Sequence, residues 1–156
     1  MLTFKKLKKK LMNLDDVETL LSRLKFANAV DQRDYARVSE NLSEGDLKDF
    51  FLDQEVLKGR FNQTINAEME KLDLHESNTD DPLKDESRHG SWPLAKDISG
   101  KSLLEWSQHR EGKALLFYEE LLSHINRGEI REMLLSQKNE VRMAIEKLEA
   151  LAEAGS

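Results

Sequence analysis

The sequence contains no cysteine, which excludes disulfide bonds, thiolate catalysis and cysteine-based zinc sites. Only two prolines and seven glycines occur in 156 residues, so little turn material is present for a β-sandwich and helices are favoured. No apolar run approaches the roughly 20 residues that a membrane-spanning helix needs, and the N-terminus lacks the apolar segment of a secretory signal. We therefore expect a cytoplasmic protein.

The charge balance and the motif content narrow the function classes. Lysine and arginine total 24 against 30 aspartates and glutamates, a net charge of −6 that argues against broad nucleic-acid binding. The sequence has no glycine-rich phosphate loop and no Gly-x-Ser-x-Gly elbow, and we assign no catalytic residue. We expect a protein partner or a homo-oligomer, and no nucleic acid.

Apolar residues recur every three or four positions in four segments, which is the spacing of a buried helix face. The predicted helices cover residues of about 14–41, 44–73, 102–126 and 128–152. The first two are joined by a short connection and should be antiparallel neighbours, whereas residues 74–101 contain both prolines and should form a long crossover. We predict a single-domain, all-α, antiparallel four-helix bundle over residues 14–152.

Three helix starts carry capping signals. Asn13 is a plausible N-cap for the first helix. Ser43 with Asp46, and Ser102 with Glu105, have the spacing of a capping box, in which two side chains satisfy exposed backbone N–H groups. These pairs are predicted to open the second and third helices.

Residues 1–13 form a basic, amphipathic extension. Its lysines are Lys5, Lys6, Lys8, Lys9 and Lys10. Such a segment can lie on an anionic membrane or contact an acidic partner. The alternative, which we favour, is that it only extends the first turns of the following helix, because the same apolar spacing runs directly into that helix.

Each predicted helix is apolar at both ends of its buried stripe and polar near the middle. Glu111 is the clearest case, and an unpartnered acid in an apolar seam costs several kcal/mol unless a partner, a proton or a metal offsets it. Gln54 lies about as far after the first turn as Asp31 lies before it, so the two should share a layer. The predicted buried polar layer consists of Asn28, Asp31, Gln54, Glu111, Gln137 and Glu140.

A metal centre in such a layer has a known requirement. Carboxylate-bridged di-iron bundles use a Glu-x-x-His pair on each of two helices, because residues three apart project the same way. The only such pair here is Glu86 with His89, which falls in the connection and not on a helix. We therefore expect a hydrogen-bonded structural layer without a cofactor, and keep a weak iron or manganese site at Asp31 and Glu111 as the alternative.

Several local patterns resemble a known family. They are the LKDFF segment before Lys58 and Phe61, the HGSWPLAKDISG connection, Glu111 seven residues before Tyr118, and the stretch from Gln137 to Leu148. Over about residues 14–150 they resemble a bacterial family of ferritin-like four-helix-bundle proteins of unknown function, distantly similar to rubrerythrin and ferritin.

The resemblance implies two helical pairs joined by a crossover that carries Trp92. It also exposes departures, because Thr64 stands where a glutamate is expected and Ile145 where a histidine is expected. Only Glu111 matches the metal-ligand positions that the resemblance implies.

The resulting functional expectation is a non-catalytic structural or partner-binding bundle, which could be dimeric through an exposed helix face. One alternative is a di-iron or di-manganese storage protein or oxidase that uses the mid-bundle acids. A second alternative is a membrane-surface adaptor that uses the lysine-rich N-terminus.

Overall fold

The computed structural model of the chain describes residues 14–76 and 100–155. The four helices in these ranges are α2 (Leu14–Glu40), α3 (Asp46–Lys71), α4 (Gly100–His124) and α5 (Gly128–Ala154). Neither described range contains a strand, so the prediction of an all-helical four-helix bundle is confirmed. Each observed helix end lies within two residues of its predicted position.

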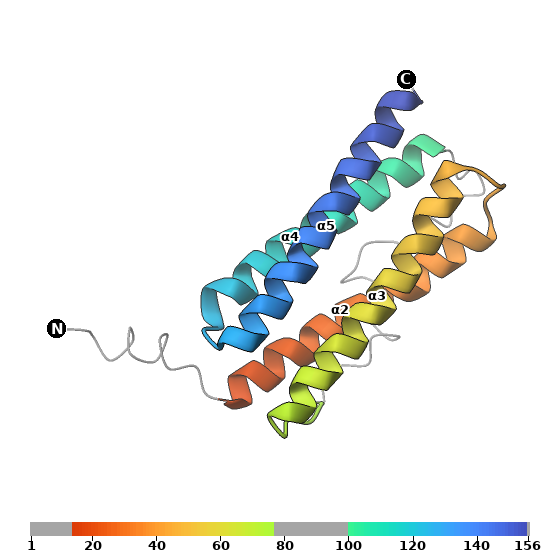
Figure 1. The fold of residues 1–156 in the computed structure, drawn as a ribbon. Coiled ribbons are helices and arrows are strands. Elements are labelled where there is room, and N and C mark those ends of the chain that lie inside the picture. Colours follow the sequence, from red (N-terminus) through yellow and green to blue (C-terminus); the bar gives the residue numbers. More distant parts are fainter. Residues whose placement is uncertain (1–13, 77–99, 156) are drawn as a thin grey trace.

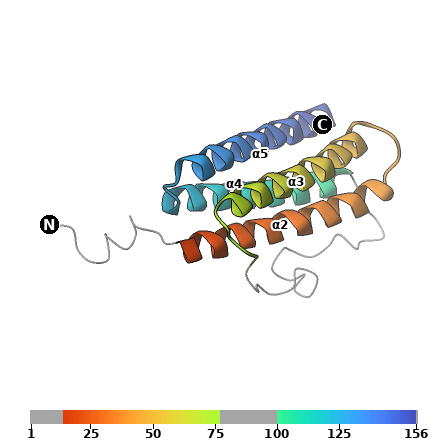
Figure 2. The ribbon, with the colours of Figure 1, turned by 60° about the horizontal axis from the view of Figure 1, so that its bottom comes forward.

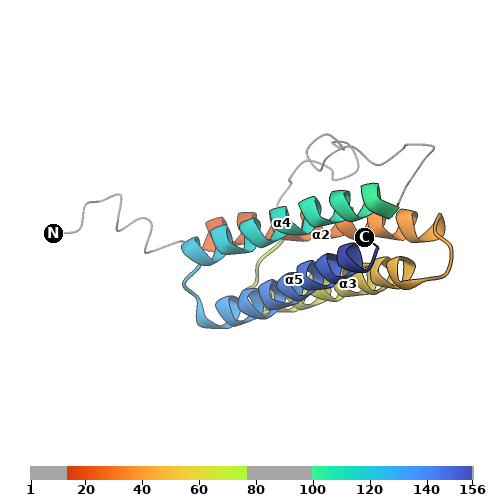
Figure 3. The ribbon, with the colours of Figure 1, turned by 90° about the horizontal axis from the view of Figure 1, so that it is seen from above.

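The helices form two pairs that lie side by side along their length (Figure 1). α2 packs mainly against α3, α4 packs against α5, and α3 also contacts α5. Figures 2 and 3 show the same arrangement from two further directions. Asn28 hydrogen-bonds to Asn62, and the Tyr35 ring contacts that of Phe51, so the end of α2 meets the beginning of α3.

Two apolar clusters form the core, one toward each end of the bundle. The cluster toward the α4–α5 turn includes Leu21, Ile65 and Leu134, all of them fully buried. The cluster toward the α2–α3 turn includes Phe51 and Leu103. Between the two clusters, α2, α3 and α4 carry polar residues on their buried faces, so a polar belt divides the hydrophobic core.

The C-terminus of α3 ends in a Schellman motif. The backbone N–H of Leu74 donates to Met69 O at 2.8 Å, and that of Asp73 donates to Glu70 O at 3.0 Å. Asp73 has a φ of 54°, the left-handed conformation that this motif requires. Leu74 and Met69 both pack into the core, which ties the helix end to it.

The predicted capping boxes at the helix starts are wrong. The N-cap of α3 is Gly45, which makes no side-chain capping bond, so Ser43 does not cap this helix. α4 begins at Gly100, so Ser102 and Glu105 lie inside the helix and not at its start. The error arises because a serine three residues before an acid is a common pattern that does not always mark a helix start. The actual N-cap of α3, Gly45 with a φ of 156°, has no side chain and so belongs to no capping pattern in the sequence.

Some predictions concern residues outside the described ranges. They include the Asn13 cap, the lysines of the N-terminal extension, and the crossover with Trp92, Glu86 and His89. Within the described ranges, no helix combines the length and the apolar character needed to cross a bilayer.

Candidate functional site

Glu111 on α4 lies at the centre of the polar belt. Its side chain has no exposed surface, and neither does that of Lys58 on α3. Lys58 Nζ donates to Glu111 Oε1 at 2.9 Å, and the Tyr35 hydroxyl on α2 donates to Glu111 Oε2 at 2.5 Å. One carboxylate therefore joins three helices, and both of its oxygens accept a hydrogen bond.

Lys58 is the partner that the sequence analysis missed. Leu57 and Lys58 lie three and four residues after Gln54, so both are compatible with the apolar spacing of α3, and periodicity favours the apolar Leu57. The structure buries Lys58 completely and leaves Leu57 only partly buried. The available signal was Glu111 itself, because a buried carboxylate requires a nearby cation or proton.

A second ionic group adjoins the first. Arg110 Nη1 lies 2.6 Å from Asp34 Oδ2 and 3.5 Å from Asp31 Oδ1. Arg33 Nε contacts the other oxygen of Asp34 at 3.0 Å, and the Arg110 guanidinium lies 4.7 Å from the centroid of the Trp106 ring. Asp34 is thus held by two arginines, whereas the contact that Arg110 makes with Asp31 is longer.

The position of Asp31 changes its titration. Burial, which disfavours the charged form, raises the pKa of the Asp31 carboxyl from 3.8 to about 7. Lys58 and Arg110 lower this pKa and the carboxylates of Glu111 and Asp34 raise it, so the value of about 7 is the net result with burial as the largest cause. Asp31 therefore holds a proton over much of the acidic range, which lowers the number of negative charges in the belt.

The tyrosine beside Glu111 acts as a neutral donor. Burial raises the pKa of the Tyr35 hydroxyl well above 10.0, and the nearby Glu111 and Asp31 carboxylates add to the effect. The hydroxyl therefore keeps its proton and donates it to Glu111 in a hydrogen bond. This arrangement keeps the proton on Tyr35.

A chain of neutral hydrogen bonds continues the belt to α5. The Tyr118 hydroxyl donates to Gln137 Oε1 at 2.7 Å, and Gln137 Nε2 donates to Phe61 O at 3.3 Å. On the α2 side, Asn28 Nδ2 donates to Asn62 Oδ1 at 3.1 Å. These amides satisfy one another and the backbone. From the sequence alone we expect them to satisfy Asp31 and Glu111, but Glu111 bonds to Lys58 and Tyr35, and Asp31 contacts Arg110.

The structure places the six predicted layer residues as follows. Asn28, Asp31, Gln54, Glu111 and Gln137 are all buried. Glu140 is not: it is partly exposed and lines a surface pocket, because its position on α5 lies on the edge of the buried face. The belt also contains Lys58, Tyr35, Asp34 and Arg110, which were absent from the predicted layer.

The donor set does not fit a di-metal centre. Both oxygens of Glu111 accept hydrogen bonds, and the Lys58 ammonium at 2.9 Å opposes the approach of a cation. No group of three histidines, aspartates or glutamates with metal-binding geometry occurs in the described ranges. His75 and His109 are exposed and His124 is partly exposed, so none of these three imidazoles lies in the belt.

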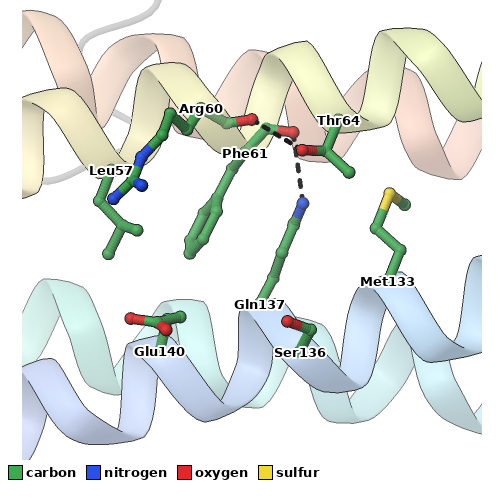
Figure 4. Close-up of a pocket in the computed structure, with 8 residues that line it drawn as sticks. All are labelled: Leu57, Arg60, Phe61, Thr64, Met133, Ser136, Gln137 and Glu140. Atoms are coloured by element: carbon green, nitrogen blue, oxygen red, sulfur yellow. Dashed lines mark hydrogen bonds between the residues drawn. The ribbon is translucent and has the colours of Figure 1, made fainter.

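A surface pocket of about 260 Å³ lies between α3 and α5 (Figure 4). Leu57, Arg60, Phe61 and Thr64 line it from α3, and Met133, Ser136, Gln137 and Glu140 line it from α5. Figure 4 shows Arg60 and Glu140 on opposite sides of one end, with Thr64 and Met133 toward the other. Gln137 belongs to both the pocket wall and the hydrogen-bond chain of the belt.

Comparison with known proteins gives no relative from which a function could be transferred. No family model, no curated protein and no solved structure matches this chain.

Proposed function

We propose that this chain is a non-catalytic helical bundle that acts as a structural or partner-binding protein, with the antiparallel, ferritin-like topology that its sequence suggests. The observation that carries the proposal is the Lys58–Glu111–Tyr35 triad. Lys58 and Glu111 have no exposed side-chain surface, and each of the two Glu111 oxygens has a donor. The reactive groups of the belt are therefore directed at one another and not at a substrate.

The belt has a clear structural use. Apolar side chains attract one another without direction, whereas a buried charge is stabilised only in the helix register that brings it to its partner. Glu111 meets Lys58 of α3 and Tyr35 of α2, and Arg110 meets Asp34 of α2. These contacts fix α4 against the α2/α3 pair.

The experiment for the non-catalytic proposal is metal analysis of protein purified without a metal-chelating column. We expect iron and manganese well below one ion per chain, in the wild type and in Glu111→Ala alike. One ion or more per chain, lost in Glu111→Ala but retained in the exposed control Glu105→Ala, would overturn the proposal in favour of a carboxylate metal protein.

The structural role of the triad is tested by removing both charges together. Lys58→Met with Glu111→Leu keeps similar volumes and leaves no buried ion in the triad. We expect the doubly substituted protein to keep its helical circular dichroism and to unfold cooperatively. Loss of the folded state in this variant would show that the charges do more than fix the register.

A further inference from the structure

The outer face of α3 and α5 carries two short stripes of exposed side chains. Asp53, Val56 and Arg60 follow one another on α3 at spacings of three and four residues, so they share one side of the helix. Lys147 and Met143, with the partly exposed Glu140, do the same on α5. Each stripe has a large apolar side chain between two opposite charges, and 60% of Val56 and 44% of Met143 are exposed.

The two stripes lie at matching heights along the bundle. Gln137 bonds to the backbone of Phe61, and Leu57 faces Glu140 while Thr64 lies toward Met133 (Figure 4). Residue numbers therefore rise along α3 where they fall along α5. With Phe61 and Gln137 taken as level, the height of every other residue along the bundle follows from a rise of about 1.5 Å per residue. The two members of each pair then differ in height by at most about 3 Å, and the pairs are Asp53/Lys147, Val56/Met143 and Arg60/Glu140.

The order of charges along the two stripes is complementary. Asp53 on α3 is level with Lys147 on α5, and Arg60 is level with Glu140, so acid faces base at both heights. No ion pair links any of these four side chains to another residue in the described ranges. The face thus offers opposite charges at matching heights without using them inside the chain.

We infer that the α3/α5 face binds a second copy of this chain, with a two-fold axis running along the groove between the two helices. This inference rests on the proposed partner-binding function and names the partner. Rotation about such an axis lays α3 of one copy on α5 of the other at unchanged height. Arg60 then meets the partner's Glu140, Asp53 meets the partner's Lys147, and Val56 meets the partner's Met143, each contact occurring twice.

The pocket between α3 and α5 fits this arrangement as a hydrated space. In the dimer the two pockets face each other across the axis, and each wall carries the Thr64 and Ser136 hydroxyls and the Gln137 amide. Such a polar cavity holds water that bridges the two copies. The apolar contact is confined to Val56 and Met143, so charge pairing sets the orientation of the copies and the dimer should weaken at high salt.

The test is a charge exchange followed by sedimentation velocity over a range of chain concentrations. We expect a concentration-dependent dimer for the wild type. Arg60→Glu alone and Glu140→Arg alone each place like charges opposite one another twice, and each should raise the dimer dissociation constant about tenfold or more. An equimolar mixture of these two variants should restore dimerisation, because every contact between unlike variants again joins opposite charges.

The mixture separates a contact between copies from a contact within one chain. If Arg60 and Glu140 paired only within the chain, the mixture would behave like its two components. Arg142→Glu on an exposed position of α5 outside the stripe is the matched control and should leave the dissociation constant unchanged. Circular dichroism of each variant confirms that these exposed substitutions preserve the fold.

A wild-type chain that stays monomeric at every concentration, or a mixture that fails to recover the dimer, would overturn the inference. That outcome is distinct from failure of the proposed function, which the metal analysis reports. A dimer that contains stoichiometric metal would support the dimer inference and contradict the non-catalytic proposal. A metal-free monomer would contradict the dimer inference and leave the non-catalytic proposal in place.

Discussion

Asp31 gives this bundle a pH-dependent stability that can be worked out from its surroundings. In the folded chain the pKa of the Asp31 carboxyl is about 7, compared with 3.8 for an unperturbed aspartate. The folded state therefore binds this proton more tightly than the unfolded state does. The stabilisation from the bound proton is fully present below pH 3.8, and it is lost as the pH rises toward 7.

The magnitude follows from the size of the shift. About three pKa units at 1.36 kcal/mol each correspond to about 4 kcal/mol, an upper limit because the neighbouring charges rearrange when Asp31 ionises. Asp31→Asn places a neutral group of nearly the same shape at this position. We expect the variant to gain stability relative to the wild type as the pH rises from about 4 to about 7, by up to about 4 kcal/mol.

The assay is urea unfolding of the wild type and of Asp31→Asn at several pH values across this window. Asp49→Asn, on an exposed position of α3, provides the baseline for the same chemical change away from the belt. Parallel pH profiles of the wild type and Asp31→Asn would refute the reasoning, because they would show that Asp31 ionises alike in the folded and unfolded chains. A variant less stable than the wild type at every pH would point instead to a hydrogen bond that only the acid can make.

Three further substitutions test other parts of the structure. Lys58→Met should lower the free energy of unfolding by about 3–5 kcal/mol in denaturant unfolding, because it leaves the Glu111 charge buried without its cation. Adding Glu111→Leu should recover most of this loss, and equal stability of the single and double variants would contradict the coupling. Asp73→Gly should raise the unfolding free energy by about 1 kcal/mol, since glycine adopts a φ of 54° without the strain of a side chain, and a lower melting temperature would argue against strain there. Arg131→Ala should cost about 1–3 kcal/mol in thermal unfolding, because the Arg131 guanidinium bonds the carbonyls of Leu122 and Ile125 at the end of α4, whereas Arg131→Lys should lose less.

The triad also bears on which substitution of Glu111 is tolerated. From the sequence, Glu111→Leu should be tolerated better than Glu111→Ala because it fills the volume and removes a buried ion. The structure shows that either substitution leaves the Lys58 ammonium buried without its carboxylate. The predicted order of the two variants stands, since the cavity term still differs, but both should be less stable than the doubly substituted protein.

The helices and the height of the polar belt could be predicted because both follow from periodicity. An apolar stripe that turns polar near the middle of each helix places Asn28, Asp31, Gln54, Glu111 and Gln137 without any knowledge of the neighbours. The pairing inside the belt could not be predicted in the same way. Leu57 and Lys58 both satisfy a three-or-four spacing, yet they point about 100° apart on an α-helix, and only packing against the other helices decides which one is buried.

Arg110 and Asp34 were missed for a related reason. Each stands beside a belt residue in the sequence, and long or charged side chains are normally expected to reach solvent. Here the Arg110 guanidinium on α4 donates a hydrogen bond of 2.6 Å to the Asp34 carboxylate on α2. The burial of both side chains therefore depends on a contact between the two helices. Glu140 shows the opposite error, because the same periodicity that identified Gln137 cannot tell the centre of a buried face from its edge.

The division of the apolar interior has a mechanical consequence. Within the described ranges, the apolar cluster that contains Leu21 and Leu134 is separate from the cluster that contains Phe51 and Leu103, and ion pairs and amides lie between them. A void made at one end can be filled only by movement at that end, since the bonded layer does not deform smoothly. We therefore expect the two ends of the bundle to unfold locally with different free energies, which amide hydrogen exchange would measure.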